Sequence, residues 1–125
     1  MYPDNLKYKE THAWVNGDGI EVTIGITNYA AEQLGEIIYL DLTSQEGDKI
    51  EAGESFGSIE SVKSISDLIA PISCTVIAVN EDLMDDPTIV NNDPYEAGWM
   101  LKVKLSDNNE LDSLLDVKRY EETLD

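Results

Sequence analysis

Apolar residues alternate with other residues along three stretches of the chain. A period of two is typical of a strand that buries one face and exposes the other. The three series are Ile20, Val22, Ile24 and Ile26; Ile38, Leu40 and Leu42; and Leu101, Val103 and Leu105. Segments 11–15 and 75–79 are also strand-like, and Asn-Gly and Asp-Gly pairs at 16–19 predict a turn. The pattern therefore predicts a mainly β protein of short strands.

The same pattern predicts two helices. Thr27 is a suitable N-cap for a short helix over 28–34, and Gly35 follows its end. Near the C-terminus the apolar spacing changes to three and four residues. This change predicts a helix over 108–120, with Asp107 and Glu110 arranged as a capping box. Residues 80–94 are rich in Asp, Asn and Pro and are predicted to form a long connection. Short strands with a terminal helix indicate a compact β barrel or sandwich, as one domain over 1–125.

The centre of the chain, about residues 55–70, is predicted to form a hairpin that turns at Val62-Lys63. Tight hairpins prefer Asn-Gly, Asp-Gly or Gly at the turn, so Val62 and Lys63 are unusual there. Such a departure from a local rule often marks a functional site. These residues alone support a second reading equally well, in which Lys63 is a solvated turn lysine without function. The apolar spacing also permits a helix, but the glycine and serine content of this segment disfavours it.

Composition limits the function classes. The chain has 26 acidic and 8 basic residues among 125, a net charge of -18, which disfavours nucleic acids and anionic membrane surfaces. No apolar run approaches the roughly 20 residues of a membrane span. A single cysteine fits a reducing compartment. We therefore expect a cytoplasmic protein, or one of the mitochondrial matrix if a presequence has been removed, and a monomer that binds neither nucleic acid nor membranes.

The residues offer little for catalysis. His12 is the one histidine, so no histidine-based metal cluster can form, and its position beside Trp14 is more typical of a structural role. Cys74 lies among apolar residues and is expected to be a small buried side chain rather than a nucleophile. No glycine-rich phosphate loop is present. An exposed lysine at a rigid turn suits a different task, the covalent attachment of a swinging group.

Three blocks of sequence identify the class of carrier. They are Gly25-Ile26-Thr27 with Glu32-Gln33-Leu34-Gly35-Glu36, then Glu60-Ser61-Val62-Lys63-Ser64 with Ser66-Asp67 and Pro71, then Asn91-Asn92-Asp93-Pro94-Tyr95-Glu96-Ala97-Gly98-Trp99. Their order and spacing resemble those of the H-protein family of the glycine cleavage system, and the resemblance runs from about Tyr8 to Tyr120. It sharpens the predicted fold to the barrel-sandwich hybrid of lipoyl and biotinyl carriers.

The resemblance implies a non-catalytic carrier. In that family the lysine at the position of Lys63 carries lipoate in amide linkage. Glu60, Ser61, Val62 and Ser64 would present it to a lipoate ligase or a lipoyl/octanoyl transferase. The arm would receive an aminomethyl group from glycine decarboxylase (P protein) and deliver it to the aminomethyltransferase (T protein). Dihydrolipoamide dehydrogenase (L protein) would then reoxidise the arm.

The family also shelters the loaded arm in a surface cleft. Thr11 and Asp67 match residues of that cleft, and Asp67 would hold the cationic amine. Two positions depart from the family: Ala13 replaces the glutamate of His-Glu-Trp, and Cys74 replaces a usual glycine. Ala13 leaves a second hypothesis open, a relay protein that passes its lipoyl or octanoyl group from Lys63 to other carrier domains. A third reading is an unmodified acidic interaction domain.

Overall fold

The computed structural model describes residues 3–17 and 19–124, so Asp18 of the predicted turn lies outside the described residues. The strands are β1 (Lys7–Tyr8), β2 (Ala13–Asn16), β3 (Glu21–Ile26), β4 (Ile37–Leu42), β5 (Lys49–Ile50), β6 (Ser55–Ser61), β7 (Ile65–Ile69), β8 (Cys74–Val79) and β9 (Leu101–Leu105). The helices are α1 (Asn28–Leu34), α2 (Asp82–Asp85), α3 (Thr88–Asn92), a 3-10 helix η1 (Asn108–Ser113) and α4 (Val117–Glu122).

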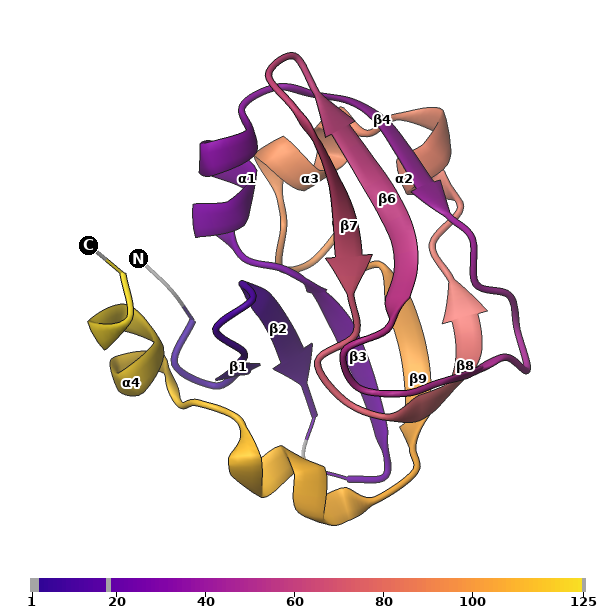
Figure 1. Cartoon of the computed structure of the whole chain (residues 1–125), viewed down its shortest axis with the longest axis vertical. Helices are drawn as coiled ribbons and strands as arrows, with labels where there is room; N and C mark the ends of the chain where they lie inside the picture. The colour runs from indigo at the N-terminus through magenta and orange to yellow at the C-terminus, as the bar shows by residue number, and fades with distance from the viewer. Residues whose placement is uncertain (1–2, 18, 125) are drawn as a thin grey trace.

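The strands form two sheets whose pairs are all antiparallel. One sheet has the order β1-β2-β3-β9-β8-β5, and the other has the order β4-β6-β7. Figure 1 shows the β6–β7 hairpin projecting at the top of the molecule, with α1 beside it and both termini at the left, about halfway down. The prediction of a mainly β fold of short strands is confirmed, and the hairpin excludes the helical alternative for residues 55–70.

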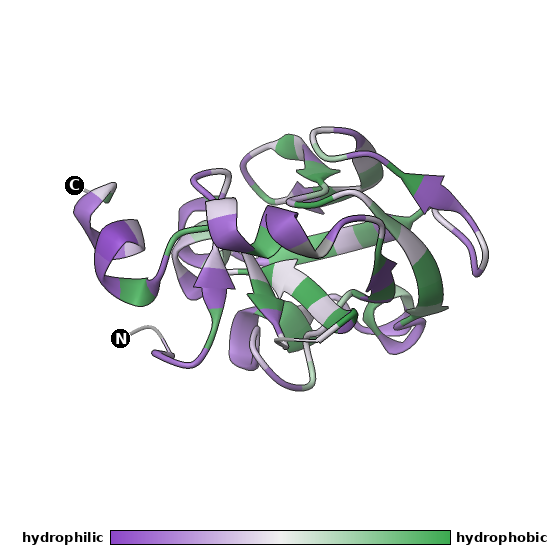
Figure 2. Cartoon of the chain, turned by 90° about the horizontal axis from the view of Figure 1, so that it is seen from below, coloured by the Kyte–Doolittle hydropathy of each residue, from purple (hydrophilic) through white to green (hydrophobic). Residues whose placement is uncertain are grey.

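The main core lies between the two sheets because each strand turns its alternate apolar side chains inward. Figure 2 shows green apolar segments gathered in the centre of the molecule, with purple polar segments along the outer turns and helices. Two residues of the predicted inward-facing series are exposed: Ile20, at 48%, precedes β3, and Ile38 lies in β4. Ile38 is 50% exposed, whereas Ile37 is fully buried, because a bulge between Ile37 and Tyr39 shifts the inward-facing positions of β4.

A second, smaller core ties the two ends of the chain together. The rings of Tyr8 and Tyr120 stack 4.8 Å apart, and Trp14 and Leu6 are buried in the same cluster. This packing explains why the helix predicted over 108–120 is divided into η1 and α4. Leu115 lies between them and exchanges two backbone hydrogen bonds of 2.7 Å with Tyr8, so it adopts an extended conformation instead of a helical one.

Local signals for the ends of helices succeed in one place and fail in another. Thr27 caps α1 by accepting a hydrogen bond from the backbone of Ala30, as predicted. Half of the capping box predicted at 107–110 forms: the Asp107 carboxylate caps η1 by accepting a hydrogen bond from the Asn109 backbone at 2.9 Å, whereas the Glu110 carboxylate accepts one from the Ser73 backbone instead of closing on its own helix. The predicted connection 80–94 contains the short helices α2 and α3, which pack on β4. In the part of the chain that the structure describes, no helix is long and apolar enough to cross a bilayer.

Candidate functional site

The turn between β6 and β7 presents Lys63 to solvent and is held together by Ser61. The Ser61 hydroxyl oxygen accepts hydrogen bonds from the backbone amides of Lys63 at 3.1 Å and Ser64 at 3.2 Å. The backbone of Ser61 donates a further bond to the Ser64 carbonyl at 2.8 Å. Neither Val62 nor Lys63 has a positive φ, so this turn does not need the glycine or asparagine of the usual two-residue hairpins.

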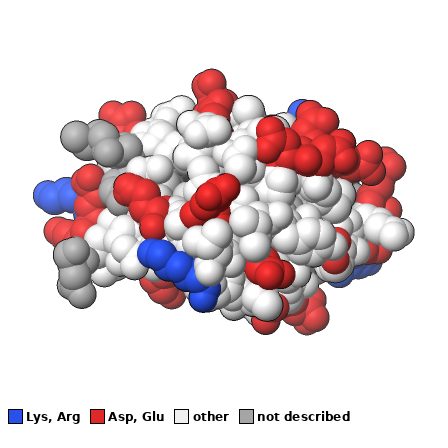
Figure 3. Space-filling model, turned by 90° about the horizontal axis from the view of Figure 1, so that it is seen from above, with Lys and Arg blue, Asp and Glu red and all other residues white. Residues whose placement is uncertain are grey.

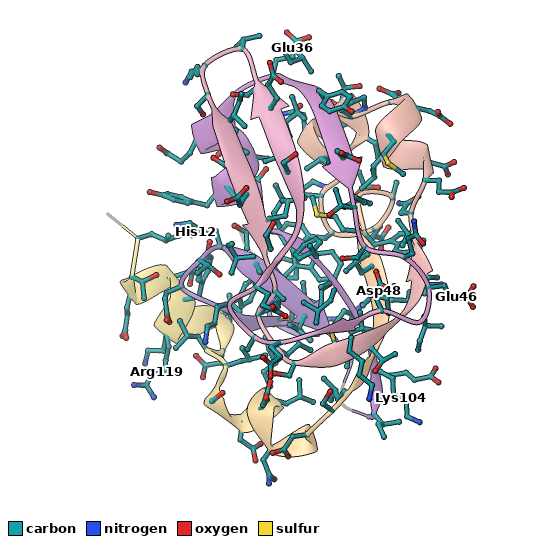
Figure 4. The ribbon with its side chains drawn as sticks, turned by 45° about the vertical axis from the view of Figure 1, so that its right-hand side comes forward. His12, Glu36, Glu46, Asp48, Lys104 and Arg119 are labelled. Atoms are coloured by element: carbon teal, nitrogen blue, oxygen red, sulfur yellow. The ribbon has the colours of Figure 1, made fainter. Side chains whose placement is uncertain are left out.

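A second segment supports the turn from the side. The backbone amide of Val62 donates to the carbonyl of Glu36 at 3.1 Å, from the loop between α1 and β4. Gly35, with φ +82°, lies next to the Lys63 side chain, so a Cβ at this position would be 3.4 Å from the Lys63 Cε. Figure 4 shows Glu36 at the same end of the molecule as the hairpin tip. Gly35 and Glu36 belong to the first sequence block, but the sequence did not indicate that they contact the lysine turn.

Replacement of Ser61 by alanine is expected to loosen the lysine turn without unfolding the sheets. Two backbone amides would lose their shared acceptor, and the expected loss of unfolding free energy is about 1 kcal/mol. Urea unfolding would measure the loss, and hydrogen exchange at the Lys63 and Ser64 amides would locate it. Ser64→Ala is the matched control, because that side chain is exposed. Equal stabilities of the two variants would contradict the role assigned to Ser61.

The predicted recognition residues do not all face solvent. Val62 is 63% exposed and Lys63 and Ser64 are also exposed, whereas Ser61 is only 4% exposed and acts inside the turn. Glu60 lies in one row with two exposed apolar residues, Tyr39 on β4 and Ile65 on β7. The surface beside Lys63 is therefore partly apolar and carries one carboxylate, a combination suited to contact with another protein.

A cleft of about 210 Å³ lies beside the hairpin and brings Thr11 and Asp67 together, as the resemblance implied. Helix α1 forms one wall with Ala30, Gln33 and Leu34, and the hairpin supplies Ile59, Ser66 and Leu68 as well as Asp67. His12 and Ile26 complete the lining. The cleft is mainly apolar, and Asp67 is the one carboxylate among its lining residues. Ala13 is 4% exposed and does not line it.

His12 also lines the cleft, although the sequence indicated only a structural role for this residue. Its Nδ1 lies 2.8 Å from the Tyr120 hydroxyl, which is also 2.8 Å from the Thr27 hydroxyl. His12 has φ +73°, a conformation that few side chains adopt, and its ring packs against Tyr29. Burial lowers the pKa of His12, so the imidazole is neutral at pH 7 and adds no positive charge near Asp67. Figure 4 places His12 well below the hairpin tip.

The lowered pKa of His12 predicts that stability falls in mild acid. The unfolded chain binds a proton at His12 below about pH 6.5, where the folded chain does not yet bind one. Stability contributed by neutral His12 is therefore complete above that pH and decreases as the pH falls toward the folded pKa. Urea unfolding at several values between about pH 5 and 8 would measure this. His12→Asn, which tolerates the same φ and does not titrate, should show a smaller decrease, and identical pH profiles would contradict this assignment.

Cys74 is fully buried in β8, and burial raises the pKa of its thiol to about 11. The prediction of a small buried side chain is confirmed, since a thiol with this pKa is protonated near neutral pH and is a poor nucleophile. Among the described residues, no group of three or more His, Cys, Asp or Glu side chains is arranged to bind a metal ion. The site therefore consists of an exposed amine at the tip of the hairpin and a mainly apolar cleft beside the same hairpin.

Comparison with known proteins agrees with this geometry. Residues 6–125 match the family model described as "Glycine cleavage H-protein". The glycine cleavage system H proteins of Staphylococcus carnosus and Bacillus cereus strain AH187 are each 51% identical, over 98% and 96% of this chain and 96% and 94% of their own lengths. The crystal structure of a glycine cleavage system H protein from Mycobacterium marinum superposes with a TM-score of 0.86 at 37% identity, covering 96% of both chains. These likenesses confirm the lipoyl-carrier fold, and the chain belongs to the glycine cleavage H-protein family.

Proposed function

We propose that this chain is the lipoyl-lysine carrier of a glycine cleavage system, with Lys63 as the covalent anchor. The observation that carries the proposal is the exposed Lys63 amine, on a turn held by Ser61 and by the Glu36 carbonyl, beside the cleft of Thr11 and Asp67. An amide bond to lipoate would remove the positive charge of Lys63 and tether a long flexible arm at the tip of the hairpin.

The cleft fits the chemistry of a lipoyl arm. Ile26, Leu34 and Leu68 offer apolar surface for a hydrocarbon chain, and the lysine stem lies beside Gly35. When attached, lipoate supplies a disulfide that opens to two thiols and can accept a one-carbon group. Asp67 would hold the cationic amine of that group inside the cleft, and neutral His12 would not repel it. The walls from α1 and the hairpin would limit the access of water.

The acidic surface suits docking to basic faces of partner enzymes. Figure 3 shows red acidic side chains gathered on the side of the molecule away from the termini, where α2 lies in Figure 1. A net charge of -18 accelerates encounter with positively charged surfaces. The expected partners are the decarboxylase, the aminomethyltransferase and dihydrolipoamide dehydrogenase, together with a lipoate ligase or a lipoyl/octanoyl transferase.

Ala13 supports one alternative, a relay that passes lipoyl or octanoyl groups from Lys63 to other carrier domains. With alanine in place of the glutamate that the family has here, Asp67 is the one carboxylate in the described lining of the cleft. A relay would need the same lysine turn but no protection of a loaded amine. A relay would transfer the lipoyl or octanoyl group from Lys63 to an added carrier domain, whereas an aminomethyl carrier would keep it, and the intact masses of both proteins distinguish the two.

The deciding experiment combines the lipoylated protein with purified glycine decarboxylase and glycine. Intact mass should show one aminomethyl group on the arm, and Asp67→Asn should shorten the lifetime of that species while leaving lipoylation unchanged. Asp48→Asn, a change at an exposed carboxylate outside the cleft, is the control. Absence of loading on a fully lipoylated protein would refute the aminomethyl carrier and favour the relay.

A further inference from the structure

We propose that Asn91, in α3, is a positioning residue that determines how efficiently Lys63 is acylated. The inference rests on the proposed function of Lys63 and adds to it a residue that lies far away in the sequence. Asn91 does not contact the lysine turn itself. It acts through the loop of Gly35 and Glu36, whose carbonyl group holds the turn.

The Asn91 side chain binds that loop on both sides of Glu36. Its Nδ2 donates a hydrogen bond to the Gly35 carbonyl at 2.9 Å, and its Oδ1 accepts one from the Ile37 amide at 3.0 Å. The carbonyl of Glu36, between these two contacts, accepts the Val62 amide at 3.1 Å. We call this set of three hydrogen bonds the Asn91 clamp. It links α3 to the residue that immediately precedes Lys63.

Only a side chain with a donor and an acceptor on one planar group makes both contacts of the clamp with the loop. Asparagine has this pair, whereas the carboxylate of aspartate can only accept and would face the Gly35 carbonyl oxygen. The loop also needs external support. Gly35 has φ +82° and ends α1, and β4 has a bulge at its start, so regular secondary structure does not hold Glu36 in place. The clamp supplies the missing hydrogen bonds.

Loss of the clamp would make the lysine turn more mobile at the point where the acylating enzyme must find the amine. Val62 is 63% exposed, so its amide would exchange the Glu36 carbonyl for water once the loop moved. The stem of Lys63 lies along Gly35 and would lose this guide as well. An acylating enzyme must bring the amine to its acyl donor in one orientation, and mobility at the anchor lowers the fraction of productive encounters.

Helix α3 itself is anchored independently of the clamp, which makes the proposal testable. Val90 is fully buried in the main core, so Val90→Ala would destabilise α3 without removing any hydrogen bond of the clamp. Asn92 is exposed on the same helix, so Asn92→Ala and Asn92→Asp are controls that make the same changes of shape and charge next to Asn91. Asn91→Ala removes both contacts with the loop, and Asn91→Asp removes only the donated hydrogen bond.

The experiment measures acylation of each variant by a lipoate ligase with lipoate and ATP, and hydrogen exchange at the Val62 and Lys63 amides. Asn91→Ala is expected to lower kcat/KM for acylation about tenfold and to raise exchange at Val62 by a similar factor. Asn91→Asp should show the same direction of change. Val90→Ala, Asn92→Ala and Asn92→Asp should acylate within about twofold of the unmodified sequence, even where Val90→Ala lowers the melting temperature.

Two results would overturn the proposal. One is acylation of Asn91→Ala at the rate of the unmodified chain. The other is an equal slowing in Val90→Ala at matched stability, which would show that general destabilisation is the cause. Failure of the unmodified chain itself to be acylated at Lys63 would instead refute the proposed carrier function, so the two failures can be distinguished.

Discussion

Lys63→Ala is expected to abolish lipoylation completely, whereas the unmodified chain treated with lipoate and a lipoylating enzyme gains one lipoyl group. The amide needs a primary amine, and Lys63 is the lysine placed at the tip of the β6–β7 turn. Because the side chain is exposed, the substitution should change the unfolding free energy by no more than about 0.5 kcal/mol. Intact mass of both proteins measures the effect directly, and thermal unfolding verifies that the variant is folded.

Lys49→Ala is the matched control for this experiment. Lys49 is also exposed, but it belongs to the short strand β5, where it pairs with Thr75, and does not lie at a hairpin tip. It should be lipoylated as fast as the unmodified chain. A lipoyl group on folded Lys63→Ala would contradict the anchor, and peptide mapping would then identify the lysine that carries it.

Gly57→Ala is expected to cause the largest loss of stability among single methyl additions to the lysine hairpin. A Cβ at Gly57 would lie closer to the carbonyl oxygen of Asp41 than nonbonded atoms can approach, and 3.2 Å from the Leu42 Cα. These are backbone atoms of the paired strand β4, so no side-chain rotation relieves the contact. We expect a loss of about 3 kcal/mol, which corresponds to a melting temperature lower by roughly 10 °C.

Urea and thermal unfolding measure this loss, with Gly19→Ala as the control. Gly19 lies in a turn where an added Cβ would have no described atom within 4 Å, so its stability should stay within about 0.5 kcal/mol of the original. Alanine also favours a strand more than glycine does, so local propensity opposes the expected result. A Gly57→Ala protein as stable as the control would contradict the close packing of β4 on β6.

Much of the fold followed from local patterns. Alternating apolar residues located β3 and β9, and Thr27 and Gly35 correctly bounded α1. Local patterns failed where a distant segment competed for the same backbone groups. Leu115 pairs with Tyr8, which divides the terminal helix, and Glu110 binds Ser73 instead of capping its own helix. The short helices α2 and α3 were missed because Asp, Asn and Pro are as frequent in loops as at the ends of short helices.

The site divides in the same way. The sequence blocks indicated Lys63 as the anchor and implied a cleft with Thr11 and Asp67, and the structure places both of these residues in the lining of one cleft. The sequence did not indicate that Ser61 would be buried inside the turn, or that His12 would line the cleft with a lowered pKa. Burial and solvation are properties of the assembled fold, so no single segment encodes them.

The sequence by itself determined the family, the alternation of the strands and the position of the lysine in a hairpin. These features depend on residues that are neighbours in the chain, whose spacing is visible in the sequence. Only the tertiary structure decided what surrounds Lys63: the Glu36 carbonyl from one loop and the Asn91 clamp from α3. Those contacts join segments far apart in the sequence, and their hydrogen-bond geometry exists only after the two sheets and the helices have packed together.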